Sequence, residues 1–327
     1  MRTADCAFKT GDLVEIRGPA EIAAGLGADG TVDGLPFMPE MIQYCGQQFR
    51  ISCRAFKACV ECFDKWRFGD VREFRSNDVW VLEELRCSGA NHDGCQRGCL
   101  VFWHGSWLKK PDATSIRASH QGREELLNKL KTRVAPDKYF CQSTQLLSAT
   151  RPLSRIGRFR ICLEEVLTRN AAVFHVLRSI VLPIFWKVVH RYVRPRHVVG
   201  RLTKTPLVKL DLQASEVVEV RSADEIANTL NSGGCNRGLR YDHGLNKLCG
   251  TRQRVRDRLD KMIVESTGKM VQLEGTVTLE GTCCFCHMSA VGGCPRKDPI
   301  YWREAWLKRL NVAPSKQAQP DLQATMH

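Results

Sequence analysis

The chain has 327 residues, of which 43% are hydrophobic and 26% charged, and it carries a formal net charge of +14. This composition excludes a disordered polymer and leaves room for two ordinary globular domains. The excess charge is concentrated, because residues 111–211 hold 19 Lys and Arg against 7 Asp and Glu, a net charge of +12. No apolar run reaches the roughly 18 residues that a membrane-spanning helix needs.

The cysteine content and the N-terminal residues together indicate a reducing compartment. The chain contains 16 cysteines, and its first residues, MRTADCAFKTGD, lack the apolar segment of a secretory signal. We therefore expect a cytoplasmic protein, with an alternative location on the surface of the inner membrane. In a reducing compartment, clustered thiols are more often metal ligands or reactive groups than disulfides.

The sequence contains an internal repeat. Residues 14–57 align with residues 218–261 at a constant offset of 204, with 15 identities in 44 positions. Unrelated sequences would share roughly 6% of positions, so the match indicates duplication. The similarity resumes at the end of each copy, where VFWHGSWLKK (101–110) matches IYWREAWLKR (300–309). We predict copy 1 over residues 10–110, a basic linker over 111–211, copy 2 over 212–310 and a disordered tail over 311–327.

The elements expected in each copy follow one order. A short strand at Leu13–Arg17 or Val217–Arg221 is followed by helical turns at residues 21–26 or 225–230, and a further helical turn precedes Cys45 or Cys249. Strands are expected at residues 49–53 and 79–85, and at 254–258 and 277–280. The closing tryptophans have roughly helical spacing and predict a terminal helix. The fold class expected is α+β, with two related small β-rich, barrel-like modules joined by a basic, mainly helical linker.

Three cysteine positions are shared by the copies and predict metal ligands. A tetrahedral site needs four thiolate or imidazole groups, so each copy has to add a fourth of its own. Glycines beside these cysteines allow a loop to turn its amides toward metal-bound sulfur. The candidate ligands are Cys45, Cys87, His92, Cys95 and Cys99 in copy 1, and Cys249, Cys284, Cys286, His287 and Cys294 in copy 2.

The spacing of the candidate ligands does not identify the metal. Zinc is favoured for a structural site of four thiolates, or of three thiolates and one imidazole, and an iron–sulfur cluster is the alternative. The competing interpretation is that these cysteines are buried apolar or redox-active thiols. That interpretation is preferred for four other cysteines, which are Cys6, Cys141, Cys162 and Cys235.

The composition of the basic linker indicates a binding surface and offers no catalytic motif. Arg123–Arg133 is expected to be a helix, and the segment 170–200 combines apolar residues with cationic ones. This segment fits a helix packed across the two copies, a helix on an anionic membrane surface, or, with less support, a nucleic-acid contact.

The paired arrangement resembles a family of uncharacterised bacterial proteins with two cysteine-rich repeats. The resemblance rests on VEIR/VEVR, the Cys-Gly step, LRCSGANHDGCQRGC and YWREAWLKR. It implies no activity. The function expected is a metal-binding protein with a binding or accessory role and an unidentified protein partner. The alternatives are a redox or metal-dependent enzyme of a bacterial biosynthetic pathway and a peripheral membrane protein that binds through the basic amphipathic linker.

Overall fold

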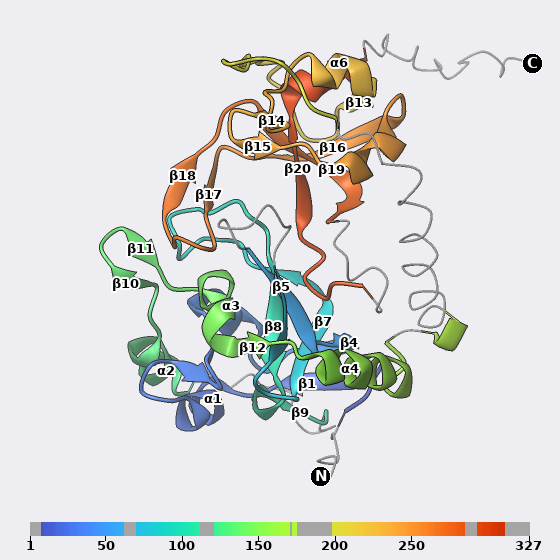
Figure 1. The fold of residues 1–327 in the computed structure, drawn as a ribbon. Coiled ribbons are helices and arrows are strands. Elements are labelled where there is room, and N and C mark those ends of the chain that lie inside the picture. The colour runs from blue at the N-terminus through green and yellow to red at the C-terminus, as the bar shows by residue number, and fades with distance from the viewer. Residues whose placement is uncertain are drawn as a thin grey trace, which may run out of the picture. The chain divides into compact units, whose positions relative to one another are not determined.

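The computed structural model describes residues 8–61, 70–111, 121–170, 172–174, 198–284 and 293–310. Helices and strands are mixed along the chain, and the pairings between named strands are antiparallel (Figure 1). The α+β class expected from the sequence is confirmed. The chain forms two compact units. Unit 1 comprises residues 1–196, 259–274 and 281–300, and unit 2 comprises residues 197–258, 275–280 and 301–327.

Unit 1 is built on a five-stranded sheet with the strand order β8-β7-β4-β1-β9. Its strands are β1 (Leu13–Ile16), β4 (Gln48–Arg54), β7 (Val79–Arg86), β8 (Leu100–His104) and β9 (Leu108–Lys109). The other elements of copy 1 are α1 (Pro19–Gly25), β2 (Thr31–Val32), β3 (Leu35–Pro36), the 3-10 helices η1 (Pro39–Tyr44) and η2 (Gly105–Trp107), β5 (Lys57–Val60) and β6 (Asp70–Phe74).

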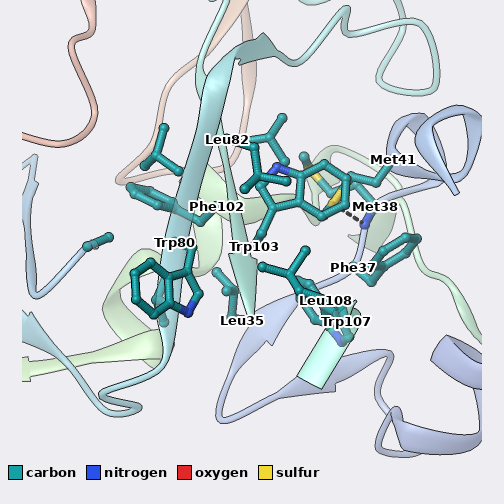
Figure 2. Close-up of a cluster of buried hydrophobic side chains, with 14 of the residues drawn as sticks. Leu35, Phe37, Met38, Met41, Trp80, Leu82, Phe102, Trp103, Trp107 and Leu108 are labelled. Atoms are coloured by element: carbon teal, nitrogen blue, oxygen red, sulfur yellow. Dashed lines mark hydrogen bonds between the residues drawn. The ribbon is translucent and has the colours of Figure 1, made fainter. Parts of the chain in front are cut away.

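Aromatic side chains from several of these elements make the core of unit 1. Trp80, Trp103 and Trp107 are fully buried, and Phe37 meets the Trp107 ring edge to face at 5.2 Å (Figure 2). Buried aromatic side chains contribute large apolar areas, and edge-to-face pairs add to that stabilisation. Every residue of β8 is buried, so side chains on both faces of this strand belong to the interior of unit 1.

The closing tryptophans do not lie on a terminal helix, so that prediction was wrong. Trp103 belongs to β8, and Trp107 ends the short 3-10 helix η2. The strand brings one ring to the core and the turn after it brings the other, so a spacing of four residues arises without an α-helix. Trp302 and Trp306 have the same arrangement, on β20 (Pro299–Arg303) and on η5 (Glu304–Trp306).

Residues 121–170, which the sequence assigned to the linker, pack into unit 1. They form α2 (Arg123–Lys129), β10 (Arg133–Ala135), β11 (Lys138–Tyr139), α3 (Gln142–Ala149), β12 (Thr150–Pro152) and α4 (Arg155–Leu167). The helix expected at Arg123–Arg133 therefore ends at Lys129. Strand β12 pairs with β6, and the buried Gln142 amide binds both the N–H and the C=O of Phe102 at 2.8 Å. Gln142 thus satisfies backbone groups of β8 as a neighbouring strand would.

A hairpin from copy 2 completes unit 1. It consists of β17 (Lys261–Ile263) and β18 (Met270–Gln272). Loop residue Gln96 binds the backbone of β17, since its N–H donates to the Lys261 carbonyl at 3.1 Å and its side-chain oxygen accepts from the Lys261 N–H at 3.0 Å. Segments far apart in the sequence therefore share one unit, and its boundaries differ from those of the sequence repeat.

Apart from residues 281–283 and 299–300, which belong to unit 1, unit 2 contains a five-stranded sheet whose strand order, β20-β19-β16-β13-β21, corresponds to that of unit 1. Its elements are β13 (Val217–Val220), α6 (Ala223–Ala227), β14 (Cys235–Asn236), β15 (Leu239–Arg240), η3 (His243–Leu248), β16 (Arg252–Arg258), β19 (Thr276–Cys283), β20, η5 and β21 (Leu307–Arg309). The strands predicted at residues 217–221, 254–258 and 277–280 correspond to β13, β16 and β19.

Two predictions fall mainly outside the described residues. These are the tail at 311–327 and most of the segment 170–200. Among the helices that the structure describes, none is both long and apolar enough to cross a membrane.

Candidate metal centre

Four cysteines line one small cavity in unit 1. Cys87, Cys95, Cys99 and Cys141 surround it, together with His92 and apolar, amide and guanidinium groups. The cavity volume is about 30 Å³. A single water needs about 10–15 Å³ by this measure, whereas small-molecule sites usually enclose several hundred. The cavity therefore suits a water or an ion and is too small for an organic substrate.

Strand pairing brings Cys87 and Cys99 together. Arg86 on β7 is paired with Leu100 on β8, and the Cys87 N–H donates to the Cys99 carbonyl at 2.8 Å. The two cysteines therefore stand opposite each other where the strands end. Residues directly opposite in an antiparallel ribbon project to the same face. The sheet register thus directs both thiols to the cavity.

The loop between these two cysteines is closed tightly by its glycines. Gly89 has a φ of +69°, and a Cβ added there would lie 2.0 Å from the Cys95 carbonyl oxygen. Only glycine fits this approach. The closed loop carries Cys95 to the hairpin of copy 2, where the Ile263 N–H donates to Cys95 Sγ at 3.3 Å. Amide donors of this kind stabilise sulfur that carries negative charge or binds a metal.

Cys141 lines the cavity from a different part of the chain, the start of α3. It is the residue before α3, and its backbone N–H donates to Thr144 Oγ1 at 3.0 Å, which fixes the start of that helix. No sequence pattern groups Cys141 with the others, because it lies outside both repeat copies. Its contribution follows from the packing of α3 against copy 1.

His92 is held in a buried ion pair. Its Nδ1 lies 2.6 Å from Glu40 Oε1, and its Nε2 lies 3.0 Å from the Phe140 carbonyl oxygen. Both neighbours are acceptors, so the ring carries a proton on each nitrogen. Burial alone would lower the pKa of His92, but the hydrogen bond and charge of Glu40 raise it above its ordinary value. Burial likewise acts to raise the pKa of Glu40, and the bond from His92 outweighs it and lowers that pKa.

Among the described residues, only one group of three His, Cys, Asp or Glu side chains has its potential ligand atoms within 4.8 Å of one another. This group consists of Glu40, Cys87 and His92. Glu40 Oε1 also accepts from the Asn91 N–H at 3.2 Å, and its Oε2 has no hydrogen-bond partner. A metal ligand needs a free lone pair on the imidazole. Because both His92 nitrogens are engaged, this set is better described as an ion pair that fixes the loop beside Cys87.

Burial keeps three of the cavity thiols protonated. Desolvation raises the pKa of Cys99 to about 12, and it raises the pKa values of Cys87 and Cys141 as well. A protonated thiol is a poor nucleophile, and reactive cysteines in proteins have lowered pKa values. The site therefore lacks the electrostatic character of a catalytic thiolate.

Two arginines bring positive charge to the cavity, one from each repeat copy. Arg97 and Arg296 line it, and both guanidinium groups contact Glu265 Oε2, at 3.3 and 2.6 Å. Glu61 and Asp298 complete this charge cluster, with Glu61 2.6 Å from Arg97 and Asp298 2.9 Å from Arg296. For Cys99, burial raises the pKa more than the charges of Arg97 and Arg296 lower it, and Asp298 raises it further.

Among the described residues, the other predicted ligands do not line this cavity. Cys45 is part of the hydrophobic core of unit 1, where burial raises its pKa to about 12. Cys249 belongs to unit 2 and lies 3.5 Å from the Tyr241 hydroxyl, whereas Cys284 and Cys294 belong to unit 1. Cys286 and His287 lie outside the described residues.

Comparisons with models of protein families, with curated proteins and with solved structures found no match to this chain. The site is therefore interpreted from its own residues.

Proposed function

We propose that the protein is a metal-binding protein that holds a zinc ion between Cys87, Cys95, Cys99 and Cys141, and that it acts as a binding or accessory component. The observation that supports this most is the convergence of four thiols on one cavity of ionic size. Two of these thiols come from a strand pair, one from a glycine-closed loop and one from a helix start. Cys99 is one of the two fourth ligands that the sequence offered, and Cys141 replaces the predicted ligand Cys45 in this proposal.

The thiols have to move for zinc to bind. Tetrahedral zinc with Zn–S bonds of about 2.3 Å places its sulfurs ~3.8 Å apart. Within the described residues, no three cysteine sulfurs lie within 4.8 Å of one another. Rotation about χ1 would draw the thiols inward, and the positive charge of the ion would release their protons.

An iron–sulfur cluster is the second candidate. In a cluster with four cysteine ligands, the thiolates bind several irons rather than one, so the sulfurs stand farther apart than around a single zinc ion. The wider placement of the cavity thiols favours this geometry, and the small cavity volume favours zinc. A redox enzyme that uses a low-pKa thiolate has less support, because burial raises the thiol pKa values.

We also propose that each repeat copy is a barrel-like module and that a basic, mainly helical segment joins them. The matching strand orders of the two five-stranded sheets support a common module. The helices α2, α3 and α4 support helical character between the copies, although β10, β11 and β12 lie there too.

Metal analysis of the full chain tests the proposal. Protein purified without air is expected to be colourless and to contain zinc, and Cys99→Ser and Cys141→Ser are each expected to lose one equivalent relative to the wild type. Cys45→Ser and Cys53→Ser are the matched controls, since both thiols are shielded within unit 1 and neither lines the cavity. Both controls are expected to keep the full metal content.

Two results would contradict the proposal. If the wild-type protein contained neither zinc nor iron, the proposed metal centre would be wrong. If both Cys99→Ser and Cys141→Ser kept the full metal content, the metal would not be bound in this cavity. A brown protein with broad visible absorbance would instead replace zinc by an iron–sulfur cluster.

A further inference from the structure

Helix α4 has one face that packs into unit 1. Ser154 begins the helix, since its Oγ accepts from the Gly157 N–H at 2.9 Å. Ile161 and Glu165 are buried one turn apart, and the Glu165 carboxylate forms a buried ion pair with Lys57 of β5. A charge pair in the protein interior fixes the rotation of a helix, because turning the helix would leave a charge unpaired. Helix α4 therefore keeps one defined face exposed.

The outward face of α4 is apolar. Ile156, Phe159, Leu163 and Leu167 follow one another at intervals of three, four and four residues, and their side chains are between 51% and 84% exposed. This spacing places them in a single stripe. Val173 and Phe174, shortly after the helix, are also exposed. Isolated apolar residues are common on protein surfaces, but a continuous stripe marks an interaction site.

The surroundings of this stripe are positively charged. Arg151 and Arg160 both bind the single carboxylate of Glu73, each at 2.6 Å, so one acidic group faces two guanidinium groups. Arg158 of α4 and Arg169, shortly after the helix, are exposed and add to this positive charge. The apolar stripe of α4 is therefore accompanied by exposed cationic side chains.

We propose that the exposed face of α4 lies on an anionic lipid surface. A helix in the plane of a membrane buries its apolar side chains at the boundary of the acyl chains, while cationic side chains reach the phosphates. Basic residues near such a surface add electrostatic attraction to the anionic headgroups. A nucleic acid would use the charge but not the apolar stripe. A second copy of the chain would bring two positively charged faces together.

Vesicle flotation with the full chain tests this assignment. The wild type is expected to bind vesicles that contain phosphatidylserine and to bind neutral phosphatidylcholine vesicles much less, with binding that weakens as salt is added. The double variant Phe159→Ser/Leu163→Ser is expected to bind the anionic vesicles at least about tenfold more weakly, because two apolar side chains no longer enter the lipid.

The matched control is Val134→Ser/Leu147→Ser, which replaces two apolar residues of unit 1 that are 60% and 57% exposed but lie away from α4. It is expected to bind vesicles as the wild type does, and thermal unfolding should show both variants to be folded. Absence of wild-type binding would overturn the proposal, as would equal binding by the α4 variant. Self-association that Phe159→Ser/Leu163→Ser abolishes, without vesicle binding, would assign this face to a second copy instead.

Discussion

Glu265 is the residue whose replacement tests most directly how unit 1 is assembled. Its carboxylate accepts four hydrogen bonds, and the donors come from both repeat copies and from α3. They are the Arg296 guanidinium at 2.6 Å, the Glu61 N–H at 2.9 Å, the Ser143 hydroxyl at 3.0 Å and the Arg97 guanidinium at 3.3 Å. Burial acts to raise the pKa of Glu265, but the charges of Arg296 and Arg97 outweigh it and lower that pKa. The carboxylate is therefore ionised and holds three segments together.

Glu265→Gln keeps the shape of the side chain and removes its charge. The amide oxygen can replace the carboxylate oxygen that faces Arg296, Arg97 and Ser143, and the amide N–H₂ then faces the Glu61 N–H, which loses its acceptor. Removing one partner of a buried charge pair costs about 3–5 kcal/mol. Asp298 still offsets part of the arginine charge, so we expect a loss near the lower limit, about 3 kcal/mol of the free energy of unfolding.

Thermal unfolding measures this loss. For a unit of this size, 1 kcal/mol shifts Tm by about 2–4 °C, so Glu265→Gln should lower the Tm of unit 1 by about 6–12 °C. Hydrogen exchange should show faster exchange in the β17–β18 hairpin. Glu125→Gln is the control, because this carboxylate is 63% exposed and forms only an i,i+4 pair with Lys129 at 3.7 Å, worth less than about 0.5 kcal/mol. If Glu265→Gln changed stability no more than Glu125→Gln, the hairpin would not depend on this charge cluster.

Two further predictions concern acidity and the cysteine loop. Because the pKa of Glu265 is lowered below its ordinary value of 4.5, its contribution is present above that value and is lost as the pH falls through the folded-state pKa. The difference in unfolding free energy between the wild type and Glu265→Gln should therefore be full at pH 7 and should shrink on acidification below about pH 4.5. Urea titrations at several pH values would measure this difference. A difference that grew on acidification would contradict the predicted direction of the pH dependence. Gly89→Ala should destabilise unit 1 and weaken zinc binding, since its Cβ meets the Cys95 carbonyl oxygen, whereas Gly11→Ala, at a similarly positive φ but in open space, should cost only about 1–2 kcal/mol. Equal effects of the two substitutions in urea unfolding would show that the loop relaxes freely.

The sequence determined much of the local structure. Alternating and apolar runs placed β1, β4, β7 and their counterparts in copy 2, and short helical signals placed α1 and η1. The glycine-rich run between Cys87 and Cys99 indicated a closed loop with thiols directed to a shared point. These features depend on residues close in the chain, so pattern and spacing are sufficient to predict them.

Only the tertiary structure decided which groups share the cavity. Cys141 joins three cysteines of copy 1 because α3 packs beside β8, and Arg296 joins Arg97 because part of copy 2 belongs to unit 1. Cys45, matched between the copies, instead fills the core. A repeat match shows which positions both copies keep, but not whether a thiol packs as an apolar group or turns toward a cavity, because that depends on contacts between segments far apart in the sequence.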